Sequence, residues 1–538
     1  MNSKILQFLQ FVVFLTVLPM AVHCLPPKLV VVISYDQMRG DYIERFRSIM
    51  SNKGFAKLTN EGTHFTECYY SHASNVTCAG HAVLMTGCNP WKTGIVSNDF
   101  FDPETQCLCY CSEEPDSATP HEKKLAPTML LVPTLGDYVS DMYPQSRQVA
   151  IAIKDRAAIL MAGKKARHVL WLDDKTGRMT TSAYYEMPAW MDDWHREHPV
   201  YSYFGKSWNT VLNNAVGYPD TVMYEGKMPG GDNVFPHTIP DSGNNAVYAF
   251  ACTPYAVSYL FQTAKRAIIQ ENMGNDSHPD ILYLGISTTD LVGHIFGPDS
   301  RETQELYYHC DTTLANFIEY LDTSIGREDY VITLCSDHGV GPIPELIANA
   351  KPVGYDAGRL SVVTLKKSLA EEVRRVFKGK EFMEPIAHMQ PPSLFLNKNY
   401  FINHDDYSKA KKMCLDYLQQ YKGLQYVAYT DDIIEGKNTQ GWDEIIFTRI
   451  KNSTHPLRSG DIVFFPQQYW IYGSNPASHG TPYDYDTHVP CVFFGNGIMP
   501  LTSHQKISPA DIAPTLGSIL GITLPKSDGK NILSIKNN

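Results

Sequence analysis

The segment PKLVVVISYD, residues 27–36, indicates the fold class of this chain. Its β-branched apolar residues follow one another without polar alternation, and the run ends at Asp36. A strand with one face in water alternates apolar and polar side chains, whereas a strand covered on both faces reads as a continuous apolar run. The segment therefore predicts a buried strand in a parallel sheet that carries helices on both faces.

Further runs of this kind recur along the chain, with helical patterns between several of them. Such alternation is typical of an α/β fold with a mainly parallel central sheet and helices on both faces. Ligands bind such sheets at the edge where the strands end, and polar residues follow several of these runs. The runs are QVAIAIKDR (148–156), DILYLGISTTD (280–290), DYVITLCSDHG (329–339) and VPCVFFGNG (489–497).

Two long segments differ from this pattern. LKKSLAEEVRRVF (365–377) and DDYSKAKKMCLDYLQQY (405–421) are amphipathic at helical spacing, which predicts surface helices of an inserted cap at about residues 345–470. A second insertion is expected at about residues 165–260, where Trp, Tyr, Asp and Pro are frequent. We expect one catalytic domain over residues 25–538, with both segments inserted into it.

The first 24 residues are predicted to be a secretory signal peptide. Lys4 precedes an apolar stretch, and the prolines of HCLPPK (23–28) end it. A retained membrane anchor is the alternative, because the stretch approaches the length of a bilayer span. We expect an exported chain, periplasmic or secreted, without stable membrane insertion after cleavage. The formal net charge of −11 argues against a nucleic-acid-binding surface.

Export would permit disulfide bonds among the 12 cysteines of the chain. The cluster QCLCYC (106–111) fits either a metal site or loop cysteines that pair with distant partners. The sequence leaves this pairing open.

Carboxylates and imidazoles follow the apolar runs at several strand ends. Mixed Asp and His sets suit zinc, whereas calcium and magnesium favour oxygen ligands alone. Each residue by itself also fits a helix cap or a structural histidine, but together they predict a site for two metal ions. The six residues are Asp36, Asp290, His294, Asp337, His338 and His488.

SHASNVTCAGHAVLMTG (71–87) places Thr77 where a helix of small residues begins. A hydroxyl there either caps the helix or, beside a metal ion, ionises more easily and becomes a nucleophile. Cys78 is a poorer candidate because no activating base is evident for it. Lys154 and Arg156 alternate at the end of a predicted strand, so a regular strand would point both to one side. A charged surface cluster is the alternative for this pair.

Six motifs resemble those of the alkaline phosphatase superfamily, over about residues 28–525. Within it, the chain is most similar to the phosphate-irrepressible alkaline phosphatases with a threonine nucleophile, to which the nucleotide pyrophosphatase/phosphodiesterases are related. The two predicted insertions match poorly. The motifs are VVVISYDQMRGDYI (30–43), VTCAGHAVLMTGCNP (76–90), TTDLVGH (288–294), SDHG (336–339), DTHVP (486–490) and DIAPTLGSILGI (511–522).

The resemblance implies two zinc ions bridged by the substrate phosphate. The ligands of one zinc would be Asp290, His294 and His488. The ligands of the other would be Asp36, Asp337, His338 and the oxygen of Thr77. Asn98, in GIVSND (94–99), resembles an asparagine that hydrogen-bonds a phosphoryl oxygen. Lys154 and Arg156 resemble a pair that grips the non-bridging oxygens.

These residues predict an alkaline phosphatase that hydrolyses small-molecule phosphate monoesters through a phospho-threonine at Thr77. Two zinc ions would balance three aspartates and an ionised Thr77, so that Lys154 and Arg156 match the double charge of a monoester. A diester carries a single charge. The alternatives are a phosphodiesterase or nucleotide pyrophosphatase on the same core, and a non-catalytic exported metal-binding protein. The sequence does not indicate the oligomeric state.

Overall fold

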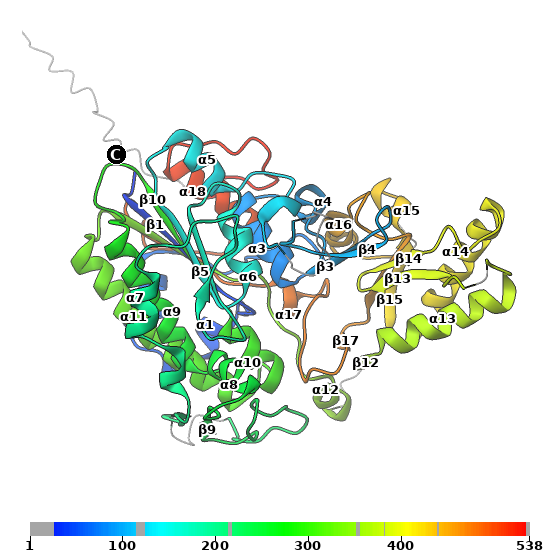
Figure 1. Ribbon diagram of the computed structural model, residues 1–538, viewed down its shortest axis with the longest axis horizontal. Coiled ribbons are helices and arrows are strands. Elements are labelled where there is room, and N and C mark those ends of the chain that lie inside the picture. The colour runs from blue at the N-terminus through cyan, green and yellow to red at the C-terminus, as the bar shows by residue number, and fades with distance from the viewer. Residues whose placement is uncertain are drawn as a thin grey trace, which may run out of the picture.

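A mainly parallel sheet forms the centre of the protein, which confirms the predicted α/β fold. The computed structural model describes residues 26–114, 124–212, 218–350, 354, 356–380, 382–437 and 441–533. Among these residues the central sheet has nine strands (Figure 1). In spatial order they are β19 (Leu501–Ser503), β2 (Thr63–Phe65), β18 (Cys491–Gly495), β11 (Tyr330–Cys335), β1 (Leu29–Tyr35), β10 (Asp280–Ile286), β5 (Gln148–Ala152), β6 (His168–Leu172) and β7 (Met179–Thr180).

Strand β1 lies between β10 and β11 and is parallel to both. Ser34 pairs with Gly285 of β10 and with Cys335 of β11, so the three strands end at the same edge. The pairs β11–β18, β18–β2 and β6–β7 are antiparallel, and the other pairs are parallel. Every residue of β1 is buried, as its continuous apolar run predicts.

Helices cover both faces of this sheet. Val31 and Ile33 of β1 face one hydrophobic core, and Val32 faces the other. Burial of such a side chain stabilises the fold by roughly 1.5–3 kcal/mol. The first core includes α9 (Pro254–Gln270) and α11 (Arg301–Ser324); the second includes α3 (Thr77–Thr86), α5 (Leu135–Met142), α6 (Asp155–Ala162) and α18 (Ile512–Ile519).

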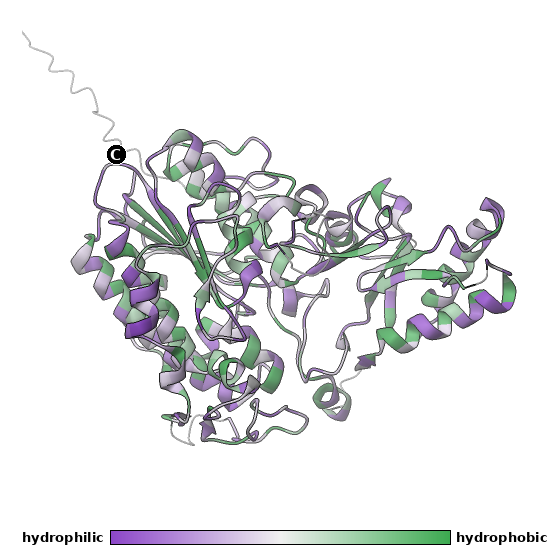
Figure 2. Cartoon of the chain, viewed as in Figure 1, coloured by the Kyte–Doolittle hydropathy of each residue, from purple (hydrophilic) through white to green (hydrophobic). Residues whose placement is uncertain are grey.

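Most of the predicted cap, residues 345–470, forms a smaller lobe beside the central sheet (Figure 1). Leu365 and Leu369 of one amphipathic helix and Leu418 of the other lie in its own hydrophobic core. Figure 2 shows that the long helices of this lobe carry both apolar and polar residues along their length. Its sheet has the order β13 (Ile386–Gln390), β14 (Ser393–Leu396), β16 (Ile462–Pro466) and β15 (Leu424–Tyr429), and its two long helices are α13 (Val362–Val376) and α14 (His404–Gln419).

Residues 165–260 differ from the single insertion that we expected. Strand β6 lies within this segment and pairs in parallel with β5, so the central sheet continues through it. Its sequence HVLWL is buried at every position, like the other sheet strands. The helix α9 at the end of the segment also packs on the central sheet. The composition of the whole segment concealed these core elements.

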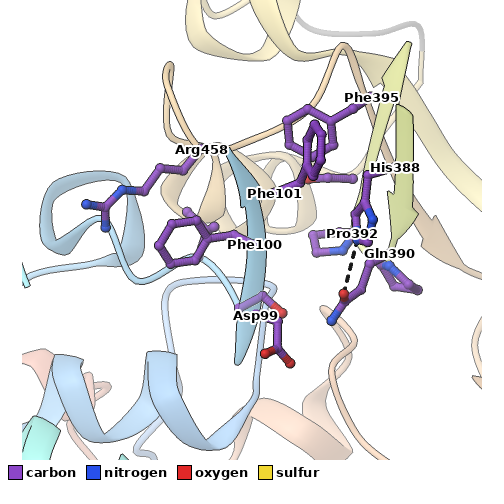
Figure 3. A pocket seen from close by; sticks show the side chains of 12 residues that line it. Asp99, Phe100, Phe101, His388, Gln390, Pro392, Phe395 and Arg458 are labelled. Atoms are coloured by element: carbon purple, nitrogen blue, oxygen red, sulfur yellow. Dashed lines mark hydrogen bonds between the residues drawn. The ribbon is translucent and has the colours of Figure 1, made fainter. Parts of the chain in front are cut away.

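A hairpin of β3 (Asp99–Asp102) and β4 (Cys107–Tyr110) joins the central part of the protein to the smaller lobe. Phe100 packs with Cys78 of α3. The ring of Phe101 stacks on His388 of β13 with a centroid separation of 5.2 Å, and it meets Phe395 of β14 edge-on. Figure 3 shows Phe100, Phe101, His388 and Phe395 around a pocket where the hairpin meets the smaller lobe.

The predicted signal peptide, residues 1–24, lies outside the described residues. Among the helices that are described, none has both the length and the hydropathy of a membrane span. The described elements run from β1 to α18, within the predicted domain of residues 25–538.

Helix α3 approaches the end of β11 so closely that only glycine fits at the contact. A Cβ atom at Gly80 would lie 2.1 Å from the carbonyl oxygen of Asp337. Replacement Gly80→Ala must therefore move α3 or the β11 end, and we expect it to lower the free energy of unfolding by about 2 kcal/mol. Urea denaturation measures this loss. Gly231→Ala is the matched control because the nearest atom to its added Cβ is 3.6 Å away; equal stability of both variants with the wild type would contradict the contact.

Candidate active site

The predicted carboxylates meet at one edge of the sheet because three adjacent parallel strands end there. Asp36 follows β1 directly, and Asp337 follows Ser336 at the end of β11. Asp290 lies in the first turn of α10 (Thr288–Phe296), which begins just after β10. His294 lies one helical turn beyond Asp290, on the same side of α10.

In the described part of the chain, two groups of side chains could each hold a metal ion. The first group is Asp36, Asp337 and His338, all fully buried. His338 Nε2 lies 3.5 Å from Asp36 Oδ1 and 3.3 Å from Asp337 Oδ2. None of these three atoms has a hydrogen-bond partner among the described residues. On the other side of the ring, His338 Nδ1 donates to the Gly339 carbonyl, so Nε2 turns a lone pair toward the carboxylates.

The second group is Asp290, His294 and His479. The Nδ1 atoms of His294 and His479 donate to the carbonyls of Ala477 and Asn75, at 2.8 and 2.7 Å. Their Nε2 atoms consequently face each other at 3.2 Å, with Asp290 Oδ1 3.3 Å from His294. Two imidazole lone pairs and a carboxylate at this separation require a cation between them, as a metal ion or a proton.

Burial is the largest single influence on the pKa values in both groups. For Asp290 and His294, however, burial is outweighed by their attraction to each other, so the pKa of Asp290 is lowered and that of His294 is raised. Burial raises the pKa of Asp36 to about 6 and that of Asp337 to about 7, and the nearby Asp290 carboxylate adds to both shifts. Burial lowers the pKa of His338 to about 4 and that of His479 to about 3. These two imidazoles are neutral near pH 7, as metal ligands must be, whereas Asp36 and Asp337 need added positive charge to stay fully ionised there.

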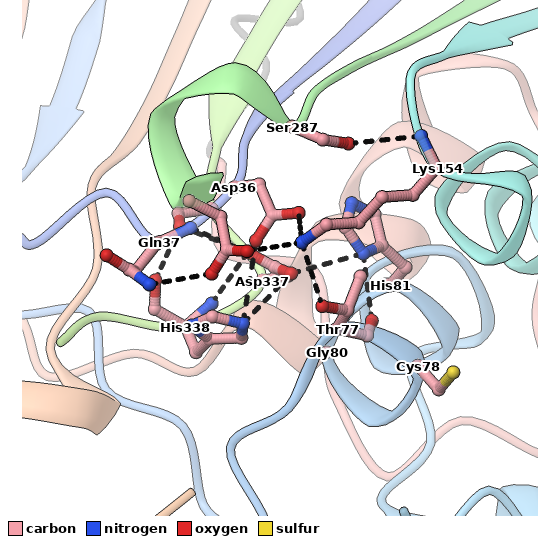
Figure 4. Close-up of polar contacts among 12 residues, drawn as sticks. Asp36, Gln37, Thr77, Cys78, Gly80, His81, Lys154, Ser287, Asp337 and His338 are labelled. Atoms are coloured by element: carbon pink, nitrogen blue, oxygen red, sulfur yellow. Dashed lines mark hydrogen bonds and ion pairs between the residues drawn. The ribbon is translucent and has the colours of Figure 1, made fainter. Parts of the chain in front are cut away.

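The Lys154 side chain contacts one aspartate of each group and the Thr77 hydroxyl. Its Nζ lies 2.7 Å from Asp36 Oδ2, 2.5 Å from Asp290 Oδ2 and 3.4 Å from Thr77 Oγ1. Figure 4 shows this side chain extended toward Asp36 and Thr77, while Cys78 points away from them. The hydroxyl, the lysine and both groups thus converge on one place.

Thr77 is the first residue of α3, and the preceding Val76 occupies the cap position. The Thr77 side chain does not cap this helix. Of the two roles that the sequence left open for this hydroxyl, helix capping therefore receives no support from the geometry. Its side chain is nearly fully buried beside Lys154.

Lys154 and Arg156 belong to a helix start and not to a regular strand. β5 ends at Ala152, Lys154 is the cap residue of α6, and Arg156 lies in the first turn of that helix. The predicted alternation along a strand is therefore wrong, because the chain turns into the helix before the charged residues. Lys154 nevertheless contacts Asp36 and Asp290 beyond the strand ends, and Arg156 donates to the hydroxyl of Tyr110.

The structure does not bring His488 to either group. Its Nε2 donates to the carbonyl of Thr66 at 2.8 Å, and its ring stacks on Tyr69 at 4.5 Å between centroids. Gly40 packs against the same ring. The sequence prediction of His488 as a ligand disagrees with this geometry, because its side chain, directly after α17 (Asp484–Thr487), is engaged with Thr66 and Tyr69.

His479 takes the place beside Asp290 and His294 that was predicted for His488. It lies in a loop between β17 (Trp470–Tyr472) and α17, without the apolar run that marked the other candidates. One feature of the sequence could have indicated His479 as a candidate ligand. It is followed by Gly480, just as His338 of the first group is followed by Gly339. Gly480 has a φ of +101°, which an L-residue rarely adopts.

The side chain of Asn98 contacts the start of α3 next to Thr77. Its Oδ1 accepts a hydrogen bond from the Cys78 backbone N–H at 3.0 Å. Arg156 Nη1 donates to the Tyr110 hydroxyl at 3.3 Å, and its Nε has no partner in the described part of the protein. The Asn98 amide thus lies at the start of α3, and the Arg156 guanidinium keeps one unpartnered N–H group among the described residues.

The chain has the fold of the alkaline phosphatase superfamily, and the strand ends of its α/β sheet present two carboxylate–imidazole groups around a hydroxyl and a lysine. The family model of the type I phosphodiesterases/nucleotide pyrophosphatases matches residues 30–488. The chain belongs to this family.

Several characterised proteins are similar over nearly the whole chain. Alkaline phosphatase PhoV of Synechococcus elongatus is 31% identical over 529 residues, covering 95% of this chain and 93% of its own. Alkaline phosphatase PafA of Elizabethkingia meningoseptica is 30% identical over 526 residues, covering 95% and 94%. The crystal structure of wild-type PafA superposes with a TM-score of 0.86 at 28% identity, covering 94% of this chain and 98% of that one.

Proposed function

We propose that this protein is an alkaline phosphatase that hydrolyses phosphate monoesters with two zinc ions, through a phospho-threonine at Thr77. The observation that carries the proposal is the convergence of Thr77, Lys154 and both candidate metal groups on one place. The names of the relatives PhoV and PafA agree with the activity.

The side chains fit zinc well. Each group combines carboxylate and imidazole donors, and buried atoms in the first group lack any other partner among the described residues. We assign one zinc to Asp290, His294 and His479, and the other to Asp36, Asp337, His338 and the Thr77 oxygen. Bound zinc would lower the pKa of a coordinated hydroxyl and offset the charge on the departing oxygen.

The groups of the chain itself then have distinct tasks. The Thr77 oxygen attacks phosphorus, a new P–O bond forms, and the bond to the leaving alcohol breaks. The α3 N-terminus stabilises negative charge at Thr77. Lys154, Asn98 and Arg156 bind the equatorial oxygens, whose charge must be held throughout the transfer. Water then attacks the phosphorylated threonine and releases inorganic phosphate.

The charge of the site favours monoesters. With three aspartates and Thr77 balanced by two zinc ions, Lys154 and Arg156 remain to match a substrate dianion. A diester carries one charge and needs space for a second organic group. The phosphodiesterase and nucleotide pyrophosphatase activities in the family's description are therefore the rival outcome of the tests below.

We also propose that the chain is exported to the periplasm or beyond the cell. The apolar N-terminal stretch after Lys4 supports this proposal. A disulfide between Cys78 and Cys111 supports it as well, because such bonds persist in oxidising compartments. An exported enzyme would meet small-molecule phosphate monoesters outside the cytoplasm. We propose no nucleic-acid partner.

The pair Lys154→Ala/Arg156→Ala tests the monoester assignment. We expect wild type to prefer p-nitrophenyl phosphate over bis-p-nitrophenyl phosphate, and the double variant to lose about a thousandfold in kcat/KM for the monoester alone. The matched control is Lys165→Ala/Arg167→Ala, an exposed pair with the same spacing that binds Asp141 and Glu186. A higher kcat/KM for the diester than for the monoester in the wild type would contradict the monoester proposal.

The pair of variants His479→Gln and His488→Gln tests the zinc assignment. We expect His479→Gln to lose about one of two zinc ions per chain and at least about a hundredfold in monoesterase activity, because a ligand is removed. His488→Gln keeps a donor for the Thr66 carbonyl and should retain both ions. Elemental analysis of the dialysed proteins measures zinc; loss from His488→Gln with retention in His479→Gln would reverse the assignment.

A further inference from the structure

The residue next to the proposed nucleophile is covalently joined to the hairpin region. Cys78, the second residue of α3, forms a disulfide with Cys111, directly after β4. Both cysteines are fully buried. The Cys78 side chain points away from the proposed zinc ligands Asp36, Asp337 and His338 (Figure 4), so the role of the bond is structural and not chemical.

Asn98 lies between the two bonded cysteines and is held from both sides. Its side-chain Oδ1 accepts the backbone N–H of Cys78 at 3.0 Å, and its backbone carbonyl accepts the N–H of Cys111 at 2.9 Å. A backbone N–H can only donate, so the atom of Asn98 that faces Cys78 must be the oxygen. The amide NH₂ of Asn98 is thereby turned toward other partners, which is the orientation that a phosphoryl oxygen needs.

Tyr110, the residue before Cys111, holds Arg156. Its hydroxyl accepts from Arg156 Nη1 at 3.3 Å and donates to Asp155 Oδ1 at 2.8 Å. The same Asp155 oxygen accepts the backbone N–H of Arg156 at 2.7 Å. The phenol therefore joins the guanidinium to the first turn of α6, and it leaves Arg156 Nε without a partner among the described residues.

Lys154 is fixed in another way, by Asp36 and Asp290. A free arginine side chain loses rotamer entropy when it binds an anion. An arginine side chain that is already held in place loses less entropy when the anion binds. A misplaced side chain lowers the rate, because phosphoryl transfer requires close alignment of the reacting atoms.

We infer that the Cys78–Cys111 disulfide and Tyr110 form one positioning device, which fixes Asn98 and Arg156 relative to Thr77. This inference rests on the proposed function, since it concerns how the same anion is held. Tyr110 acts as a positioning residue through Arg156, and the disulfide sets the distance between the start of α3 and the segment that carries Tyr110. Reduced to thiols, the same chain would keep its zinc ligands and lose this alignment.

Tyr110→Phe tests the inference, because it removes the hydroxyl and keeps the ring. We expect kcat/KM for p-nitrophenyl phosphate to fall about tenfold and the Ki of inorganic phosphate to rise by a similar factor, as for one hydrogen bond to a charged group. Zinc content should stay unchanged. In an Arg156→Ala background, the same replacement should change kcat/KM by less than about twofold, because the two residues act through one contact.

Tyr143→Phe is the matched control, since its hydroxyl donates to the Leu520 carbonyl at 2.9 Å and contacts no site residue. An effect of Tyr110→Phe that persists in full without Arg156, or one equalled by Tyr143→Phe, overturns the inference. Arg156→Ala distinguishes failure of the proposed function from failure of the positioning role. If it leaves monoesterase activity intact, the proposed function fails; if it lowers activity while Tyr110→Phe does not, only the positioning role fails.

The double variant Cys78→Ala/Cys111→Ala tests the covalent part. We expect about a tenfold fall in monoesterase kcat/KM with both zinc ions retained, because Asn98 and Arg156 lose their common anchor. The control Cys252→Ala/Cys310→Ala also removes two buried cysteines, which are unpaired, and should keep its activity. Full activity of the first variant overturns the role of the disulfide. Should that variant fail to fold, the Tyr110 measurements still decide the proposal.

Discussion

The burial of three aspartates at one edge of the sheet is the constraint on which the rest of the site depends. Asp36, Asp290 and Asp337 are almost completely removed from water. Isolated carboxylates in such a place would take up protons, as the raised pKa values of Asp36 and Asp337 indicate. Positive charge has to be supplied. Lys154 supplies part of it by contacting two of the three. Atoms of Asp36, Asp337 and His338 that have no hydrogen-bond partner in the described part of the chain mark where more is needed.

The fold creates this constraint and also makes it useful. Strands β10, β1 and β11 are parallel and in register, so they end side by side. The residues that follow these strands must therefore share one small volume. Helix α3 then approaches so closely that Gly80 contacts the Asp337 backbone, and this approach places Thr77 beside Lys154. A nucleophile, an anion-binding lysine and two metal-binding groups therefore arise from one packing arrangement. The hairpin and its disulfide add a second connection to α3 from outside the sheet.

Much of this could be predicted from the sequence, because a continuous apolar run that ends in Asp or Asp-His is typical of a buried strand with ligand-binding residues at its end. The parts that escaped prediction lack such a signal. β6 was hidden in a segment whose overall composition suggested an insertion. His479 lies in the loop after the short strand β17, which lacks the long apolar run of the other strands, so the sequence prediction fell on His488 instead. The turn from β5 into α6 depends on where the helix begins, and the pairing of Cys78 with Cys111 depends on tertiary contacts, which spacing alone does not define.

Rapid chemical quench of the zinc-loaded enzyme with p-nitrophenyl phosphate, followed by mass spectrometry of the peptide that contains Thr77, tests the central claim most directly. We predict a phosphate on Thr77 that forms as fast as the first turnover and disappears when substrate is exhausted. Thr77→Ala, which lacks the nucleophile and keeps both metal groups, should show neither the phosphate nor turnover. Full monoesterase activity in Thr77→Ala, or transient phosphate on another residue of the wild type, would contradict the proposed mechanism.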